Sequence, residues 1–379
     1  HLINEIKRSD NYHDKLIGCS AIILTGISYN DEKYLDFGLE LLKKIITSCF
    51  DTEYFPKSRN IRQLVFYLKY FIILREFLKE SSNEIPGYLD EIIFHLGKGY
   101  NFVWGSVKQS LLFNGNHNSN LEDFDVYLDY QKYSFKSEKR DLGGYGILKN
   151  KNVILGMDIG TAPESKFSEN YQSGPLSFEA IYKGRKIICN SGYYQNTKKN
   201  LNLISRSTAA HSTLILNNNS IASFKKNFKK KILNKLNFNT LNKNIVCEKN
   251  YWLIKCSHDG YLKNYGTIHE RSLEFFPEKN KFVGTDKLIK NKNFIPTNFD
   301  IRFHLMPTTK VTKTQDKDII LIELENSAWR FYSVNGSIDV ETGLYFGNKN
   351  DYLENQNIFI SGFTEKDDQV IKWEITKIE

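Results

Sequence analysis

Apolar residues recur at helical spacing through about the first hundred residues of the chain. Residues 14–26 and 87–98 follow this pattern, and Pro86 stands directly before the second segment, where a proline commonly starts a helix. Two further sets of positions repeat every three or four residues: Tyr34, Phe37, Leu41, Leu42, Ile45 and Ile46, then Ile61, Leu64, Val65, Leu68, Phe71 and Ile72. Paired amphipathic helices with short loops predict an α-hairpin array such as an α/α toroid, and a plain helical bundle has the same pattern.

After about residue 125 the pattern changes to short runs rich in β-branched and aromatic residues, separated by turn residues such as Asn335-Gly336. Many short strands without helical periodicity between them predict an antiparallel β-sandwich. We therefore expect an α+β, multidomain fold: a helical domain over residues 1–125 and a sandwich over 126–379, with an Asn-, Asp- and Tyr-rich connection at 114–133. The expected strands are Val153–Ile159, Leu176–Tyr182, Arg185–Asn190, Ser212–Leu216, Trp252–Cys256, Ser272–Phe276, Ile301–Leu305, Ile319–Leu324, Trp329–Val334, Ile358–Ser361 and Val370–Ile375.

The composition allows two globular domains and favours an acidic partner. The chain has 379 residues, 40% of them hydrophobic, and a formal net charge of +8, which suits an anionic glycan, a nucleic acid or a membrane surface. The densest basic run, Lys225–Lys231, either attracts an anionic chain or forms a solvated loop. Nucleic acid is disfavoured, because the run lacks a recognition motif and interleaved stacking aromatics.

Several other classes are excluded. The five cysteines are scattered without a C-x-x-C pair, so buried free thiols are expected and a disulfide framework is not. No apolar run reaches the ~20 residues of a membrane span. The sequence begins at His1 without a leader, as in a mature secreted form or a fragment. A G-x-S-x-G elbow, a P-loop and a G-x-G-x-x-G turn are all missing from the sequence.

The most distinctive stretch is Arg206-Ser207-Thr208-Ala209-Ala210-His211-Ser212-Thr213, which follows a strand that ends at Gly192. Small residues before His211 leave room for a ligand to approach its imidazole. The alternative is a histidine that is hydrogen-bonded inside a β-sandwich. The stretch resembles the C-terminal domain of the heparinase II/III-like polysaccharide lyases, whose usual form is close to R-S-T-x-x-H-N-T, with Ser212 here in place of the Asn.

The resemblance extends along most of the chain and is closest to a divergent bacterial branch of that family. It implies an incomplete α/α toroid followed by a β-sandwich, and cleavage of uronate-containing polysaccharides by β-elimination. The segments that carry it, in order, are Phe55-Pro56-Lys57-Ser58-Arg59-Asn60, Phe113-Asn114-Gly115, Leu176-Ser177-Phe178-Glu179, the His211 stretch, His258-Asp259-Gly260-Tyr261, His269-Glu270-Arg271, Arg302-Phe303-His304 and Trp329-Arg330-Phe331.

β-Elimination needs groups that neutralise the uronate carboxylate, a base for the C5 proton and an acid for the leaving oxygen. Arginine and asparagine suit the first task, and histidine and tyrosine suit the others. The resemblance therefore suggests His211, Tyr261 and Arg271 as catalytic residues. It suggests Arg59, Asn60, Asn114 and Arg206 as substrate-binding residues. The alternative for each is an ordinary hydrogen-bonding role on the surface or in the core.

The chain departs from the family pattern at three places. The Asn-His pair of an early toroid helix has only Tyr12-His13 as a counterpart, and Gln63-Leu64 stands where a Tyr-His pair is usual. Gln172 occupies a position where relatives often have His. The usual toroid tyrosine is therefore missing, so catalysis must use another tyrosine or another arrangement.

Relatives also hold a zinc with two histidines and an acidic residue between them. His211 with His258 or His269 would supply the nitrogens, but no Asp or Glu occurs between His211 and Glu248. We therefore expect no metal and no cofactor, and ordinary strand-end roles for the other two histidines.

These observations predict a lyase for an acidic polysaccharide, of glycosaminoglycan or alginate type, with a cleft between the two halves toward which His211 points. The alternative is a non-catalytic glycan-binding or cell-envelope protein that kept the fold. The expected location is the cell envelope or periplasm, with the cytoplasm as the alternative. The sequence does not determine the polysaccharide, the endo or exo mode, or the oligomeric state.

Overall fold

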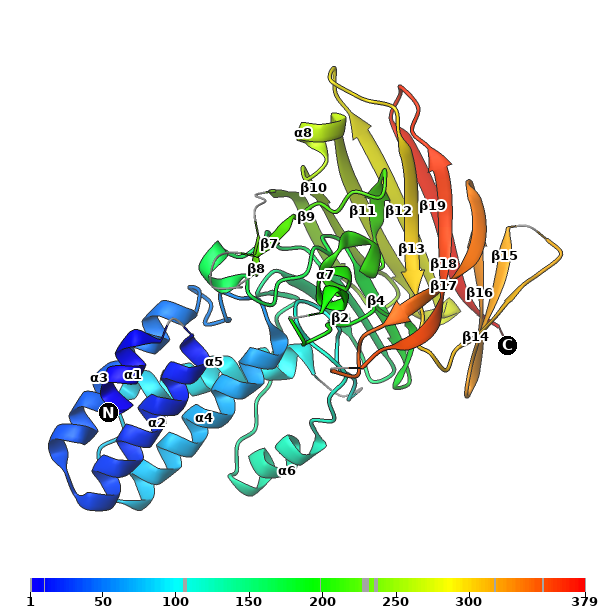
Figure 1. Ribbon diagram of the computed structural model, residues 1–379. Helices are drawn as coiled ribbons and strands as arrows, with labels where there is room; N and C mark the ends of the chain where they lie inside the picture. Colours follow the sequence, from blue (N-terminus) through cyan, green and yellow to red (C-terminus); the bar gives the residue numbers. More distant parts are fainter. Residues whose placement is uncertain are drawn as a thin grey trace.

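A computed structural model describes residues 2–9, 11–104, 108–197, 199–226, 232–234, 238–316, 318–349 and 351–378. Most of the basic run at 225–231 lies outside these residues. The first part of the chain is a helical array, drawn in blue to cyan in Figure 1. Its helices are α1 Leu2–Arg8, α2 Tyr12–Tyr29, α3 Glu32–Cys49, α4 Ile61–Glu80, α5 Gly87–Val103 and α6 Glu122–Tyr130.

The four long helices begin where local sequence favours a helix start. Asn11, Asp31 and Asn60 are N-cap residues whose side-chain oxygens accept backbone N–H groups, and Pro86 precedes α5. The predictions for 14–26, 87–98 and the two periodic sets are confirmed. Helix α6 lies inside the segment expected to be a connection, and the expected boundary at residue 125 falls within it.

The second part of the chain is antiparallel, as predicted, but it forms several sheets. The five-stranded sheet contains β1 Asp141–Leu142, β2 Tyr145–Lys149, β3 Val153–Asp158, β4 Phe178–Tyr182 and β5 Arg185–Ile188. The eight-stranded sheet contains, in spatial order, β14 Lys310–Lys313, β15 Ile319–Leu324, β16 Ser327–Ser333, β19 Gln369–Ile378, β12 Lys281–Lys290, β11 Thr267–Phe276, β10 Trp252–His258 and β9 Thr240–Cys247. The four-stranded sheet contains β17 Ser337–Tyr345, β18 Leu353–Phe363, β13 Asn298–His304 and β6 Leu214–Leu216. Strands β7 Phe224–Lys226 and β8 Ile232–Asn234 pair with each other. Short helices α7 Asn200–Arg206 and α8 Leu262–Tyr265 lie between strands.

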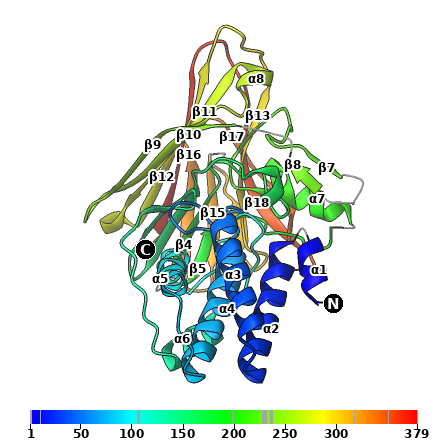
Figure 2. The same cartoon turned by 90° about the vertical axis from the view of Figure 1, so that its left-hand side faces the viewer.

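The five-stranded sheet is covered on both faces. Successive strand residues point to opposite faces, and in β3 Leu155 and Met157 pack into the sandwich core, whereas Ile154 packs into the core of the helical array. In β4, Phe178 and Ile181 divide in the same way. This sheet therefore joins the two halves, which explains why β3 is a continuous apolar run that is buried throughout. Figure 2 shows helices α2 to α6 gathered below the sheets.

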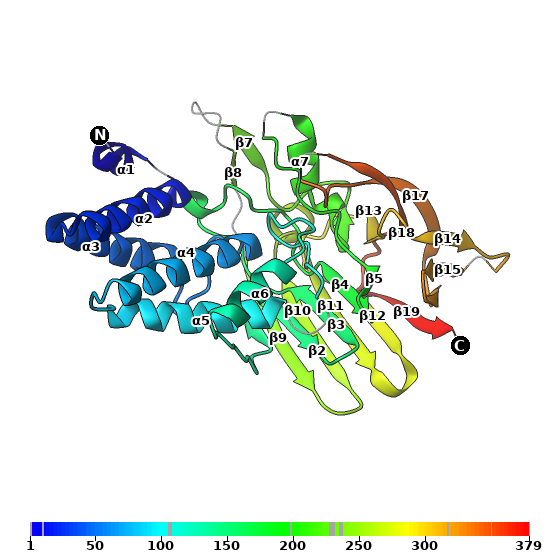
Figure 3. The ribbon, with the colours of Figure 1, turned by 90° about the horizontal axis from the view of Figure 1, so that it is seen from below.

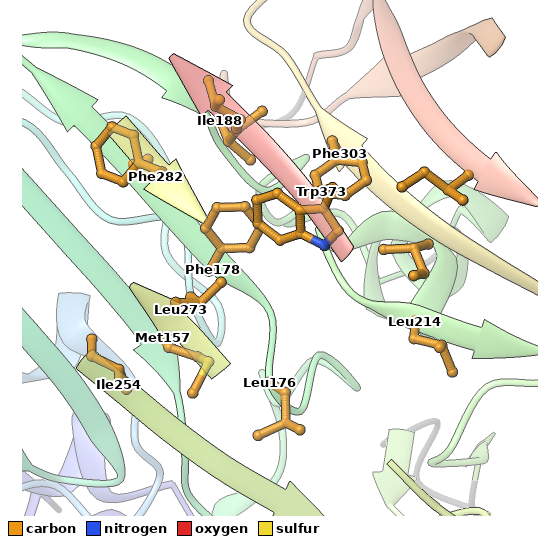
Figure 4. Close-up of a cluster of buried hydrophobic side chains, with 14 of the residues drawn as sticks. Met157, Leu176, Phe178, Ile188, Leu214, Ile254, Leu273, Phe282, Phe303 and Trp373 are labelled. Carbon is orange, nitrogen blue, oxygen red and sulfur yellow. The ribbon is translucent and has the colours of Figure 1, made fainter. Parts of the chain in front are cut away.

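Aromatic residues from three sheets meet in the sandwich core (Figure 4). Trp373 of β19 stacks on Phe178 of β4, with ring centroids 5.3 Å apart, and meets Phe303 of β13 edge-on at 4.8 Å. Such contacts fix the separation of the layers.

Candidate functional site

Arg59 joins the helical array to the five-stranded sheet. Its guanidinium donates to the carbonyl oxygens of Gly143 (3.1 Å), Gly144 (2.8 Å) and Thr161 (2.8 Å), and it pairs with the carboxylate of Asp158. Arg59 and Asp158 are 7% and 2% exposed. Every nitrogen of the guanidinium is therefore engaged inside the protein, and the geometry favours a structural role over the expected role as a substrate anchor.

Asn114 belongs to the same buried network. Its amide nitrogen donates to the Tyr145 hydroxyl (2.7 Å) and to Asp158 (3.2 Å), and the Tyr145 hydroxyl donates to the backbone carbonyl of Arg59. Burial raises the pKa of Asp158 even though Arg59 opposes this shift. Asn114 therefore positions the loop that follows it and offers no free group to a ligand.

A second polar cluster lies beside this network, where α4 starts. Asn60 caps α4 through its Oδ1, which leaves its buried Nδ2 without a hydrogen-bond partner among the described residues. That nitrogen faces Gly115, at which an added Cβ would lie 2.5 Å from it. Nearby, the Tyr193 hydroxyl donates to Oδ1 of Asn170 (2.9 Å). The cluster thus holds a free amide donor close to a tyrosine hydroxyl.

Arg62, the second residue of α4, acts electrostatically on this cluster. It is half-buried, and its charge opposes the rise that burial produces in the pKa of Tyr193. Burial, and after it Arg62 and Lys349, lower the pKa of His117. His117 Nδ1 lies 3.0 Å from the Asn118 carbonyl oxygen, which can only accept, so Nδ1 carries the proton and Nε2 carries the lone pair. The charge of Arg62 therefore acts on both the neutral imidazole of His117 and the protonated phenol of Tyr193.

A second imidazole lies near the same cation. His13, at the start of α2, stacks on Phe66 with ring centroids 3.4 Å apart, and burial together with Arg62 lowers its pKa. A crevice of about 40 Å³ opens here and is lined by His13, Tyr12 and Gln63. Figure 3 shows that β7, β8 and α7 lie on the same side of the molecule as the start of α2. The departures from the family pattern at Tyr12-His13 and Gln63 therefore meet at this crevice.

Gln172 and Arg206 hold the loops on the sandwich side. The Gln172 amide accepts from the Gly115 N–H (2.9 Å) and donates to the carbonyls of Gly192 (2.9 Å) and Ser205 (2.6 Å). Arg206 is fully buried, donates to two carbonyl oxygens and keeps Nη1 without a partner among the described residues. Burial lowers the pKa of Arg206 to about 10. Arg206 is thus placed behind the cluster, with one donor unused.

His211 is buried, with 1% of the residue exposed. Its Nδ1 donates to the Ser207 carbonyl oxygen (2.8 Å), and its Nε2 has no partner among the described residues. Burial lowers the pKa of His211 to about 4. The ring lies against Gly174, where a side chain would collide with the imidazole. We expect this ring to face the cleft between the two halves; the structure places it, buried, against the loop that contains Gly174 and precedes β4.

Tyr261 and Arg271 lie deep in the sandwich. The Tyr261 hydroxyl donates to the Leu214 carbonyl oxygen (3.1 Å). Arg271 pairs with Asp286 at 2.7 Å and 3.1 Å and donates to the carbonyls of Leu176 and Ser212. Both side chains are almost fully buried. These contacts favour structural roles over the catalytic roles expected from the resemblance.

The two remaining histidines of the sandwich form a chain that ends on the same carboxylate. Gly260 N–H donates to His258 Nδ1 (3.1 Å), so His258 carries its proton on Nε2, which faces His269 Nδ1 at 3.3 Å. His269 Nε2 then donates to Asp286 (2.7 Å). Burial lowers the pKa of both histidines. Both are members of an internal network: His258 is the last residue of β10, as expected, whereas His269 lies within β11.

The residues present do not fit the three-ligand zinc site of the relatives. His258 Nε2 and His269 Nδ1 are close enough to share an ion, but the adjacent Asp286 already accepts from Arg271, His269 and Trp373 Nε1. Within the described ranges, no group of three metal-binding side chains converges. The expectation of no zinc remains a prediction, for which elemental analysis of the purified protein is the test.

A family model described as "Heparinase II/III-like, C-terminal" matches residues 135–374, which is more than half of the chain. The chain belongs to the heparinase II/III-like family. A heparan sulfate lyase from Pedobacter heparinus has a similar structure, with a TM-score of 0.76 at 14% identity, covering 97% of this chain and 60% of that one. A heparinase III gene product gives 0.80 at 13% identity, covering 100% and 61%.

These likenesses confirm the expected fold of a helical toroid-like array followed by an antiparallel sandwich, in a divergent member of the family. This family member spans about 60% of the length of those solved lyases. A search of curated proteins gives no match. Within the part of the chain that the structure describes, no helix is long and apolar enough to cross a membrane.

Proposed function

We propose that this family member is a polysaccharide lyase that cleaves a uronate-containing acidic polysaccharide by β-elimination, with Arg62, His117 and Tyr193 as its reacting cluster. One observation carries the proposal: the charge of Arg62 acts on the pKa of both His117, whose Nδ1 carries the proton, and Tyr193. The family resemblance and the similar lyase structures support the reaction class. The expected place of action, the cell envelope or periplasm, is part of this proposal.

Each step of the reaction has a group to perform it. The Arg62 guanidinium and the free Nδ2 of Asn60 bind the uronate carboxylate and make the C5 proton removable. His117 Nε2 takes that proton, and the electron pair of the C5–H bond becomes the C4–C5 double bond. The C4–O bond breaks, and the leaving oxygen takes the hydroxyl proton of Tyr193.

His211 remains a second candidate for the base, on the strength of the family motif. Its Nε2 has no partner among the described residues. His211 is 1% exposed, as are Asn60 and Tyr193 of the first cluster, so either assignment requires the surrounding loops to move when substrate binds. Arg206, with its unused Nη1, is the matching second candidate for carboxylate binding. The two assignments name different bases, and single variants of His117 and His211 distinguish them.

The alternative function is glycan binding without catalysis. It is favoured by the small crevice of about 40 Å³ and by Gln63-Leu64 in place of the usual Tyr-His pair. Incubation with heparan-type, chondroitin-type and alginate-type polymers separates the two functions, because the double bond formed by elimination is conjugated to the carboxylate and absorbs ultraviolet light. Absorbance growth with one polymer class supports the lyase. Tight binding without absorbance growth from any polymer supports the binding protein.

A further inference from the structure

Residues 345–349 run from the end of β17 into the turn that leads to β18, and they contact both segments that carry the proposed base and acid. On the side of the base, this 345–349 turn contacts the residue that follows His117. The Asn118 N–H donates to the Gly347 carbonyl oxygen (2.9 Å), and the Asn118 side-chain amide donates to the Tyr345 hydroxyl. Tyr345 is 1% exposed. Two hydrogen bonds therefore fix Asn118 to the turn.

The same turn holds the segment of the proposed acid on both sides of Tyr193. The Phe346 N–H donates to the Ser191 carbonyl oxygen (2.5 Å), two residues before the tyrosine. The Lys349 carbonyl oxygen accepts from the Gln195 N–H (3.1 Å), two residues after the tyrosine. The position of the acid relative to the base therefore depends on this turn.

The contact with the acid's segment is a close approach of two backbones. Gly192, directly before Tyr193, has a φ of 85°, and a Cβ added to it would lie 2.7 Å from the Gly347 backbone nitrogen. A Cβ atom does not fit so close to a backbone, so this position requires glycine. Neither the turn nor the segment has room to move toward the other.

Asn118 transmits the constraint to the ring of His117. The Asn118 carbonyl oxygen lies 3.0 Å from His117 Nδ1 and accepts its proton. The tautomer of a neutral histidine is set by the hydrogen bond that one of its nitrogens makes. As long as Asn118 is fixed, the lone pair stays on Nε2, where it can take a proton from a substrate. Loss of the Tyr345 hydroxyl would release the Asn118 side chain and let this carbonyl oxygen shift.

We propose that the 345–349 turn positions the base and the acid relative to each other, and that Tyr345 keeps the proton of His117 on Nδ1 through Asn118. The effect on the reaction rests on the proposed lyase function. Tyr345 is a positioning residue, because its buried hydroxyl acts through Asn118 and not on a substrate.

Three variants test this role. Tyr345→Phe removes the hydroxyl and keeps the ring. Asn118→Ala removes the same hydrogen bond from the other side and leaves the backbone unchanged. The matched control is Asn348→Ala, which removes an exposed side chain from the same turn. Urea unfolding shows which variants are folded, and Asn118→Ala carries the test if Tyr345→Phe does not fold.

The first measurement is the tautomer of His117, which needs no polysaccharide. The ¹⁵N chemical shifts of histidine-labelled protein distinguish a proton on Nδ1 from a proton on Nε2, and His117→Ala identifies the signals among those of the eight histidines. In the intact chain and in Asn348→Ala, we expect neutral His117 to carry its proton on Nδ1. In Tyr345→Phe and Asn118→Ala, a substantial fraction should carry it on Nε2.

The second measurement is the rate of ultraviolet absorbance growth on a polymer that the intact chain cleaves. Tyr345→Phe should lower kcat about 10- to 100-fold, with KM nearly unchanged, because the hydroxyl does not contact the substrate. The double variant Tyr345→Phe/Asn118→Ala should lose no more than either single variant, since both remove the same hydrogen bond.

The proposal is overturned if His117 of the intact chain carries its proton on Nε2, or if a folded Tyr345→Phe protein keeps the tautomer or the kcat of the intact chain. Failure of the lyase function gives a different result. An intact chain that cleaves no polymer contradicts that function, and the tautomer of His117 then decides alone whether the turn positions the imidazole.

Discussion

Replacing Arg59 by methionine separates a structural arginine from a functional one. The substitution keeps the aliphatic part of the side chain and removes four hydrogen bonds, including the pair with Asp158, which is 2% exposed. Removing one partner of a buried ion pair costs about 3–5 kcal/mol. A domain is stable by about 5–15 kcal/mol, so Arg59→Met should remove a large fraction of the free energy of unfolding.

Urea unfolding followed by tryptophan fluorescence measures this loss. Trp104 reports on the helical array, and Trp329 and Trp373 report on the sandwich. Because Arg59 joins the two parts, both sets of signals should shift to lower urea. The matched control is Arg62→Met, three residues along, which is half-buried and should cost at most about 1 kcal/mol. An Arg59→Met protein within about 0.5 kcal/mol of the wild type would refute this reasoning.

Three further results are expected. Tyr193→Phe should lower lyase activity about 10²- to 10⁴-fold. The variant also loses the hydrogen bond to Asn170, which should cost no more than about 1.5 kcal/mol of stability. A fully active variant would remove Tyr193 from the mechanism. Burial lowers the pKa of His211 to about 4 and of His304 to about 3, so below pH ~6.5 the unfolded chain binds protons that the folded chain does not. The free energy of unfolding, measured in urea, should therefore fall by about 1.4 kcal/mol for each histidine between pH ~7.5 and pH ~5.5. Equal stability at the two pH values contradicts the assignment. Asp286→Leu should prevent folding or cost about 3–5 kcal/mol, because it leaves the buried Arg271 charge unpaired; a calorimetric melting temperature equal to that of the wild type would show that the network is dispensable.

The spacing of apolar residues was sufficient to predict the helices and strands that have a regular apolar pattern. The long helices and strands such as β3 and β15 follow from their sequence alone. Strand β12 was missed, because Thr285 and Asp286 interrupt its apolar residues and Gly284 accommodates the ring of Trp373. The partner of Arg271 lies on this missed strand, which is why its buried role was not predictable.

The candidate site was only partly predictable. Asn60 was named from sequence, and its free Nδ2 is part of the proposed cluster. Arg62, His117 and Tyr193 were missed, because they come from separate segments that meet only in the folded chain. Two signals were present: His117 follows the noted Asn114-Gly115 pair, and Tyr193 directly follows the noted turn at Gly192. Conversely, the His211 motif identified the family without showing that its ring is buried.

The most direct test of the central claim compares His117→Ala with His211→Ala on a polymer that the intact chain cleaves. The measurement is the rate of ultraviolet absorbance growth, with urea unfolding to show that both variants are folded. We predict that His117→Ala loses activity about 10²- to 10⁴-fold, whereas His211→Ala keeps most of it. Loss in His211→Ala with full activity in His117→Ala would contradict the Arg62 cluster as the reacting site, and no absorbance growth from the intact chain with any uronate polymer would contradict the lyase itself.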